Sequence, residues 1–161
     1  MDKELRSIPI GKAEILRSGD DVAIMALGAT VTPALEAADE LAARGIQATV
    51  LDGRFAKPLD CDLIIDIARR IKNIVTIEEN VLSGGFGSRV SALLQEKGLS
   101  DVRVKSIGIP DEFVEHGTQA ILRAKYNLDK EGILNQTLLL LNQAESASHP
   151  DSQQHTKATP F

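Results

Sequence analysis

The sequence is poor in aromatic residues and lacks tryptophan altogether. Aromatic side chains make up 3% of the 161 residues, so valine, isoleucine, leucine and alanine must fill any core. Proteins that bind single-stranded nucleic acid stack bases on aromatic side chains, and proteins that bind duplexes neutralise phosphates with lysine and arginine. This chain has a net charge of −5 and no basic run. The composition therefore argues against nucleic acid and anionic membrane surfaces as partners.

Cysteine, long apolar runs and catalytic constellations are also scarce. A single cysteine, Cys61, allows no internal disulfide, which fits a reducing compartment. No apolar run approaches a membrane span of about 18 residues, and the opening MDKELRSIPI lacks the apolar stretch of a signal peptide. The sequence shows no His/Cys metal-ligand spacing and no serine with a base beside it. We expect a soluble, intracellular domain without a self-sufficient active site.

What the sequence does contain is an alternation of short β-rich segments and segments with helical spacing of apolar residues. Strands separated by helices of this length are typical of βαβ units. The turn Ser18-Gly19-Asp20 predicts that the first two strands form a short antiparallel hairpin. Strands are expected over 13–19, 21–28, 46–52, 73–79 and 101–109. Helices are expected after Thr30 or Thr32, after Asp60, from Phe86, near 118–126 and after Asp129.

The fold predicted from this alternation is an α/β domain with three layers, α/β/α. Its sheet is five-stranded, mixed and mostly parallel, with helices on both faces. The domain is expected to cover residues 8–145, after an N-terminal lead-in of residues 1–7. From Ser146 the chain is polar and without periodicity, so residues 146–161 are expected to be a disordered tail.

A glycine cluster follows two carboxylates in EENVLSGGFGSRV (78–90), between an expected strand and an expected helix. A dinucleotide-binding loop needs a third glycine after Gly85 and Gly87, and this one is absent. Glu78 and Glu79 would also repel a pyrophosphate. Two interpretations stay open: glycines that permit close helix–strand packing, or a polar strand end that faces another domain or subunit. One of the carboxylates could cap the following amides or bind a cation.

Two further loops contain candidate functional side chains. In DGRFAKPLD (52–60), Arg54 can form a local ion pair with Asp52 or bind a carboxylate or phosphate, and Asp60 can cap the next helix. In IPDEFVEHG (109–117), His116 lies near three acidic residues and is a candidate for acid–base chemistry. An exposed or structural histidine is the alternative interpretation.

Three motifs taken together resemble one family. LDGRFAKPLD (51–60), TIEENVLSGGFGSRV (76–90) and SIGIPDEFVEHG (106–117), in this order and at this spacing, are similar to 1-deoxy-D-xylulose-5-phosphate synthases. Residues 8–41 are similar to the start of that enzyme's C-terminal domain. The resemblance covers residues 8–142. A more distant similarity extends to transketolases and to the β-subunits of 2-oxo acid dehydrogenases.

The resemblance implies a transketolase C-terminal-like fold. It implies a cytoplasmic, homodimeric parent enzyme, located in the plastid if the source is a plant. With thiamine diphosphate and Mg²⁺, that enzyme condenses pyruvate with glyceraldehyde 3-phosphate, releasing carbon dioxide, for isoprenoid and thiamine synthesis. In the family the cofactor site and the activating glutamate belong to preceding domains. We therefore expect no cofactor, no metal and no catalysis in this chain alone, with other domains and a second subunit as its partners.

The carboxyl ends of the expected strands are the surfaces that we predict to face those partners or to rim the active site. Two alternatives are a free-standing module that binds a small anion through Arg54 or the amides of 84–87, and the C-terminal domain of another transketolase-like enzyme. The candidate residues are Arg54, Glu78, Glu79, Asn80, Gly84, Gly85, Phe86, Gly87, Asp111 and His116.

Overall fold

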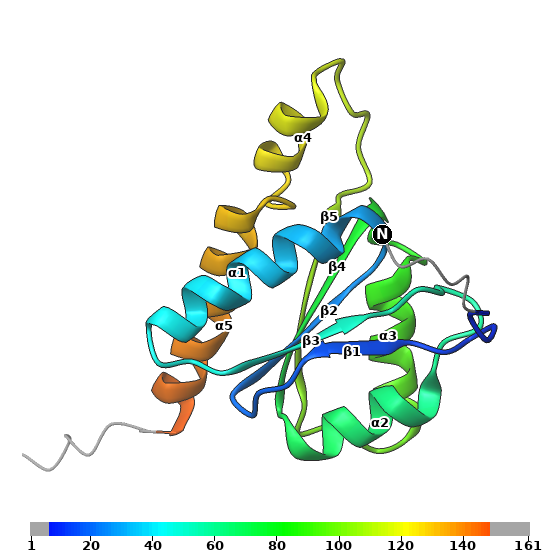
Figure 1. Ribbon diagram of the computed structural model, residues 1–161, viewed down its shortest axis with the longest axis vertical. Coiled ribbons are helices and arrows are strands. Elements are labelled where there is room, and N and C mark those ends of the chain that lie inside the picture. The colour runs from blue at the N-terminus through cyan, green and yellow to red at the C-terminus, as the bar shows by residue number, and fades with distance from the viewer. Residues whose placement is uncertain (1–6, 149–161) are drawn as a thin grey trace, which may run out of the picture.

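The computed structural model describes residues 7–148, and Figure 1 shows how its strands and helices alternate. The α/β class predicted from the sequence is confirmed. The elements are β1 (Glu14–Arg17), β2 (Val22–Ala26), the 3-10 helix η1 (Gly28–Thr30), α1 (Val31–Ala43), β3 (Ala48–Asp52), α2 (Cys61–Arg70), β4 (Asn73–Val81), α3 (Phe86–Glu96), β5 (Arg103–Ile109), α4 (Gln119–Lys125) and α5 (Lys130–Ser148).

The strands form one five-stranded mixed sheet in the order β1-β3-β2-β4-β5. β2 lies between β3 and β4 and is parallel to both, and β5 is parallel to β4. β1 is antiparallel to β3 at the opposite end of the sheet. The predicted mixed, mostly parallel sheet is therefore confirmed.

The predicted hairpin between the first two strands is wrong. β1 pairs with β3 because both sides of β2 are taken by parallel neighbours, and all five residues of β2 are buried, as is typical of the centre of a parallel sheet. The turn at residues 18–21 does not join two paired strands; it packs against the start of β3. Asp21 N donates to Gln47 O at 3.0 Å, and Gly19 N donates to Thr49 Oγ1 at 3.0 Å.

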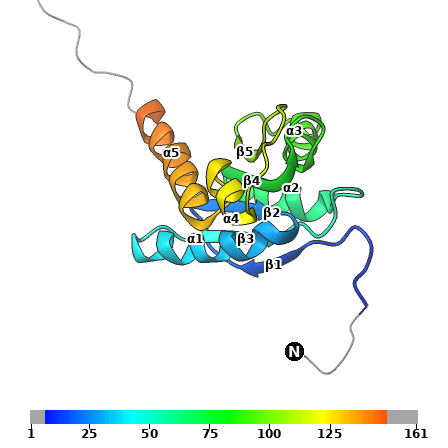
Figure 2. The ribbon, with the colours of Figure 1, turned by 90° about the horizontal axis from the view of Figure 1, so that it is seen from above.

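Helices cover both faces of the sheet, as Figure 2 shows from above. Successive residues of a strand point to opposite faces, so Ile24 contributes to the core under α1 and α5, whereas Met25 contributes to the core under α2 and α3. The three layers are thus present. Within residues 7–148, no helix has the length and apolar character needed to cross a membrane.

The C-terminal helix starts as predicted and ends later than predicted. Asp129 caps α5, because its Oδ1 accepts a hydrogen bond from Gly132 N at 2.9 Å. α5 runs through Ser148, so residues 146–148 belong to a helix and not to the predicted tail. The rest of that tail and most of the predicted lead-in lie outside the described residues.

Candidate functional site

The sequence-predicted site residues lie at one edge of the sheet or on the segments that leave it. The four parallel strands β2, β3, β4 and β5 end at this edge, and β1 begins there, because Glu14 lies opposite Asp52 at the end of β3. We call this edge the carboxyl edge, and it comprises the strand ends and the segments 27–30, 53–60 and 82–85. Ligands of open α/β sheets bind outside such an edge.

Glu78 caps α3 from inside the fold. Its side chain is 1% exposed. Oε2 accepts a hydrogen bond from Phe86 N at 2.7 Å, and Oε1 accepts one from Gly87 N at 2.8 Å. These amides belong to the first turn of the helix, which has no intrahelical acceptors for them, and a carboxylate there also opposes the helix dipole. Of the roles considered for the two glutamates, capping is the one that Glu78 performs.

Gly85 gives this carboxylate room to reach the helix. A Cβ atom on Gly85 would collide with Glu78 Oε2 and would lie 2.5 Å from Val81 O. Gly84 precedes it with a φ of +76°, a conformation that glycine adopts without steric cost. The glycines therefore form the tight turn that carries the chain from β4 into α3.

Gly87 brings α3 close to the sheet. A Cβ atom on Gly87 would collide with Thr76 Oγ1 and would lie 2.6 Å from Ser106 Oγ, and these two hydroxyls are themselves hydrogen-bonded at 2.9 Å. The Phe86 ring, 1% exposed, packs against Gly53 at the end of β3. Close helix–strand packing, one of the two interpretations left open by the sequence, is thus confirmed.

Glu79 contacts α4, whereas Glu78 contacts α3. Its Oε1 accepts a hydrogen bond from Arg123 Nε at 2.8 Å, which ties the end of β4 to α4. The alternation of strand side chains predicts that the two glutamates diverge, and they do. The side-chain amide of Asn80 lies 3.5 Å from Glu78 Oε2, at the limit of a hydrogen bond.

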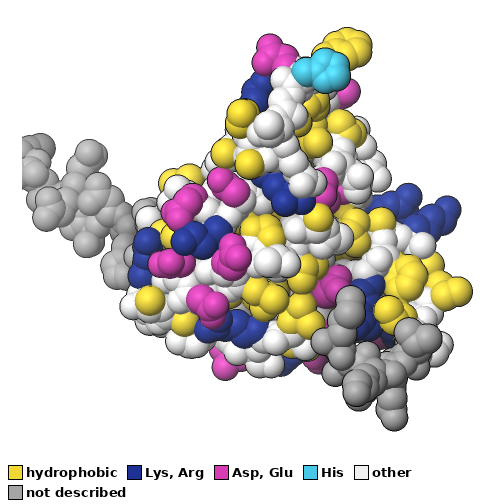
Figure 3. All heavy atoms as spheres, turned by 45° about the horizontal axis from the view of Figure 1, so that its top comes forward, with side chains coloured by type: hydrophobic (Ala, Val, Ile, Leu, Met, Phe, Trp, Pro, Cys, Tyr) yellow, Lys and Arg dark blue, Asp and Glu magenta, His cyan; other side chains and the backbone are white. Residues whose placement is uncertain are grey.

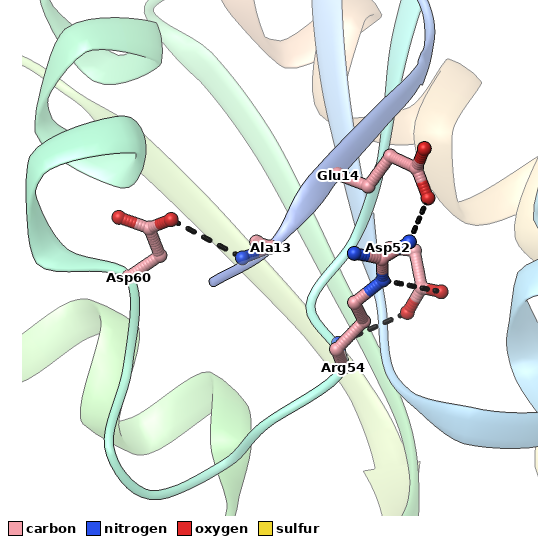
Figure 4. Close-up of polar contacts among 5 residues, drawn as sticks. All are labelled: Ala13, Glu14, Asp52, Arg54 and Asp60. Carbon is pink, nitrogen blue, oxygen red and sulfur yellow. Dashed lines mark hydrogen bonds and ion pairs between the residues drawn. The ribbon is translucent and has the colours of Figure 1, made fainter. Parts of the chain in front are cut away.

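Arg54 contacts two carboxylates beside β1, the terminal strand of the sheet (Figure 4). Its guanidinium forms an ion pair with Glu14 of β1 and lies 3.9 Å from Asp52 Oδ2, while its backbone N donates to Asp52 Oδ1 at 2.9 Å. The predicted local pair with Asp52 is confirmed, and Glu14 is an additional partner. The guanidinium is thus already neutralised by protein carboxylates.

Asp60 fixes the start of β1 to the start of α2. Its carboxylate accepts a hydrogen bond from Ala13 N at 3.1 Å (Figure 4). It also accepts one from Leu63 N in α2 and pairs with Lys12 Nζ at 3.1 Å. Burial alone raises the pKa of this carboxyl group, but the hydrogen bond from Ala13, Lys12 and the hydrogen bond from Leu63 together lower its pKa below the ordinary value.

The lowered pKa of Asp60 predicts a pH-dependent contribution to stability. A carboxyl group whose pKa is lower in the folded state stabilises the fold above its unfolded pKa of about 4, and this contribution is lost as the pH falls through the folded pKa. We expect Asp60→Asn to lower the free energy of unfolding by about 1 kcal/mol at pH 7, measured by urea denaturation. The deficit should shrink below pH 4. Asp62→Asn, in the same helical turn and exposed, is the control; equal deficits of Asp60→Asn at pH 3 and pH 7 would contradict the assignment.

The segment after β5 projects from the rest of the domain, as Figure 1 shows. We call residues 110–125, the loop and α4 together, the arm. Asp111 and His116 lie in it and are exposed. Glu112 accepts a hydrogen bond from Tyr126 Oη at 2.9 Å, which raises the pKa of the tyrosine hydroxyl. Lys125 pairs with Glu115 at 3.7 Å.

The polar side chains of the carboxyl edge are engaged within the fold itself. Glu78 is used as a cap and Arg54 as an ion-pair partner. Within the described part of the chain, no group of three His, Cys, Asp or Glu residues could hold a metal ion. Cys61 is exposed at the start of α2. His116 stands in an exposed loop without an enclosing wall, so the arrangement does not favour acid–base chemistry at this residue.

Sequence reasoning missed several of these contacts. Arg123 and Tyr126 hold the arm, and Glu14 completes the Arg54 pair. All three partners are more than ten positions away along the chain, and a charge pattern on one segment does not identify a partner on another. The exposed apolar residues of the arm could have been noticed in the sequence. Phe113 and Val114 are apolar residues that stand among acidic ones in an expected loop.

Comparisons with known proteins agree on the family. Residues 11–133 match the family "Transketolase, C-terminal domain". A solved structure described as "Split gene transketolase, inactive beta4 tetramer" superposes with a TM-score of 0.79 at 36% identity, over 88% of this chain and 46% of that one. The transketolase of Campylobacter jejuni, at 19% identity and a TM-score of 0.57 over 80% of this chain and 18% of that one, shares the fold.

The curated relatives are more specific. The 1-deoxy-D-xylulose-5-phosphate synthase 1 of Geobacter sulfurreducens is 59% identical over 133 residues, which are 83% of this chain and 21% of the relative. A synthase of Dehalococcoides mccartyi is 48% identical over 93% of this chain and 24% of its own length. This chain therefore spans between a fifth and a quarter of these relatives. It belongs to the transketolase C-terminal domain family, in the form that 1-deoxy-D-xylulose-5-phosphate synthases carry.

Proposed function

We propose that this chain acts as the C-terminal domain of a 1-deoxy-D-xylulose-5-phosphate synthase. In that role it supports contacts between domains and between subunits and does not catalyse the reaction by itself. The proposal rests on the match to two synthases, which are 59% and 48% identical to this chain. The match covers only about a quarter of their length or less, as expected for one domain of a larger enzyme. The parent enzyme would be a homodimer in the cytoplasm, or in the plastid of a plant.

The residues of this domain do not fit the cofactors of the parent reaction. A diphosphate bound at a helix N-terminus needs free amides, but the amides of Phe86 and Gly87 already donate to Glu78. The described residues also lack a carboxylate or histidine cluster for Mg²⁺. Thiamine diphosphate chemistry, which joins pyruvate to glyceraldehyde 3-phosphate with loss of carbon dioxide, is therefore assigned to the rest of the synthase.

A domain replacement tests the proposal. In the Geobacter sulfurreducens synthase, the segment that matches this chain would be replaced by the matching residues of this chain. We expect this chimeric synthase to form 1-deoxy-D-xylulose 5-phosphate from pyruvate and glyceraldehyde 3-phosphate. A chimeric synthase that is folded and binds its cofactor but makes no product would contradict the proposal.

The isolated chain is predicted to be inactive in the same assay. Nothing in its described residues can generate or stabilise the reactive form of thiamine diphosphate, because the cofactor does this chemistry only when a protein site binds and orients it. The measurement is product formation by the purified chain with thiamine diphosphate, Mg²⁺ and both substrates. Product above the blank would show that this chain contains a catalytic site of its own.

The alternative of a small-anion-binding module is less compatible with the geometry. Arg54 already has two carboxylate partners, and the amides of Phe86 and Gly87 are occupied by Glu78. Titration of the chain with phosphorylated metabolites decides between the two functions. Saturable binding that Arg54→Ala abolishes would favour the module, and no binding would favour the synthase domain.

A further inference from the structure

The outer part of the arm is exposed throughout. Every residue from Asp111 to Ile121 is exposed. Three of these are large apolar residues, Phe113, Val114 and Ile121, with exposed fractions of 102%, 41% and 62%. Figure 3 shows hydrophobic side chains gathered on this projecting part together with acidic ones. Single exposed apolar residues are common, but three on one projecting element indicate a contact surface.

α4 also lacks a core of its own. The helix has seven residues and none of them is buried, and a helix this short is marginal in water without tertiary packing. A hollow of about 650 Å³ separates it from the start of α1, between Pro33 and Ala120. A smaller apolar hollow of about 130 Å³, lined in part by Val114 and Leu122, lies at the base of the arm. Leu122 packs against the core but is only partly buried. The packing that would stabilise α4 is therefore incomplete in this domain.

Polar contacts nevertheless hold the arm in one orientation. Arg123 is bound to Glu79 of β4 at 2.8 Å, and Tyr126 is bound to Glu112 at 2.9 Å. Both contacts lie at the base of the arm and leave its outer surface uncovered. The arm is thus positioned by the domain but not completed by it.

The path of the chain indicates what covers the arm. The matched family is a C-terminal domain, and about four fifths of the Geobacter synthase lies outside the match. A polypeptide joined before residue 7 enters at the carboxyl edge, because β1 starts opposite the end of β3. The arm leaves from the same edge, after β5. Five strands at about 4.8 Å spacing make this edge roughly 20 Å wide, less than the diameter of an ordinary domain.

We propose that the arm is the element by which this domain docks onto the preceding domains of its synthase, and that docking supplies the packing that α4 lacks in the isolated domain. This inference rests on the proposed function. Phe113 is the anchor, and it stands among Asp111, Glu112 and Glu115. Lys125 pairs with Glu115, and this part of the arm stays acidic. The complementary surface is therefore an apolar pocket with basic side chains at its rim.

Hydrogen exchange in the chimeric synthase tests the inference. In the isolated chain the amides of residues 119–125 exchange rapidly, and in the chimeric synthase they exchange at least about tenfold more slowly. Phe113→Asp in the chimeric synthase returns these amides to within about threefold of the isolated chain. Leu139→Asp is the matched control, because Leu139 is 52% exposed on α5 outside the arm, and it leaves the protection intact. In the isolated chain Phe113→Asp does not change the urea midpoint, since the side chain is fully exposed.

The outcomes separate this inference from the function on which it rests. A folded but inactive chimeric synthase contradicts the proposed function. If the chimeric synthase is active but its residues 119–125 exchange as fast as in the isolated chain, only the docking inference is overturned. Equal protection of these residues in the Phe113→Asp and Leu139→Asp variants also overturns it. Protection that appears in the isolated chain at high concentration and disappears with Phe113→Asp would identify a second copy of this chain as the partner, which also overturns it.

Discussion

Glu78→Ala is expected to lower the free energy of unfolding by about 3 to 5 kcal/mol. The substitution removes a buried carboxylate and leaves the amides of Phe86 and Gly87 without their acceptor. Each buried, unpaired polar group costs about 1 to 3 kcal/mol, and the space left by the side chain adds to the loss. The measurement is urea denaturation at pH 7, followed by circular dichroism.

Glu79→Ala is the matched control for Glu78→Ala. Glu79 is the neighbouring residue with the same side chain, but it is 34% exposed and has a partly exposed partner, Arg123. A pair of this kind contributes about 0 to 1 kcal/mol. If Glu78→Ala cost no more than Glu79→Ala, the carboxylate of Glu78 could not be the cap of α3.

Gly85→Ala has the second large expected effect, a loss of about 3 kcal/mol. The backbone of Gly85 is in the extended region, with a φ of −75° and a ψ of −169°, so alanine is not excluded by conformation. The added methyl group would, however, collide with Glu78 Oε2 and approach Val81 O. Overpacking of a filled site costs about 1 to 3 kcal/mol, and displacement of the Glu78 carboxylate from its amides adds to this. Denaturation under the same conditions measures the loss.

Two comparisons make the Gly85 prediction specific. In Gly117→Ala the nearest atom to the new methyl group is a Leu122 side-chain carbon at 3.3 Å in an exposed loop, so we expect a change within about 0.5 kcal/mol. In the double variant Glu78→Ala/Gly85→Ala the oxygen that the methyl group strikes is absent. The two losses should therefore sum to more than the loss of the double variant. Strict additivity would show that Gly85 and Glu78 do not interact.

Local patterns were sufficient to predict most of the fold from the sequence. The spacing of apolar residues predicts α2, α3 and α5, and the buried-type segment 73–79 predicts most of β4, which extends two residues further, to Val81. These features depend on residues that are close in the sequence. Asp60 and Asp129 also cap the helices that directly follow them.

Pairings between distant segments could not be predicted in the same way. The turn at Ser18-Gly19-Asp20 is compatible with a hairpin, yet the antiparallel partner of β1 is β3, some 35 residues further on, because both sides of β2 are occupied. The roles of the two glutamates at the end of β4 could not be predicted for the same reason, because their partners are not adjacent to them in the sequence. Only the fold shows that Glu78 faces the amides of α3 and that Glu79 faces Arg123.

The carboxyl edge thus combines a closely packed centre with an uncovered flank. At its centre, Glu78 and the glycines at 84, 85 and 87 fix α3 against the sheet. At its flank, the arm presents apolar residues that the domain itself does not bury. This combination is compatible with the proposed task of holding other parts of a synthase in place.

The most direct measurement of that task is the steady-state rate of three proteins compared under identical conditions. These are the Geobacter sulfurreducens synthase, the same synthase without the segment that matches this chain, and the chimeric synthase that carries this chain in its place. We predict that kcat/KM of the chimeric synthase lies within about tenfold of the parent and that the truncated protein is at least about a hundredfold less active. A truncated synthase as active as its parent, or a folded chimeric synthase no more active than the truncated one, would contradict the account.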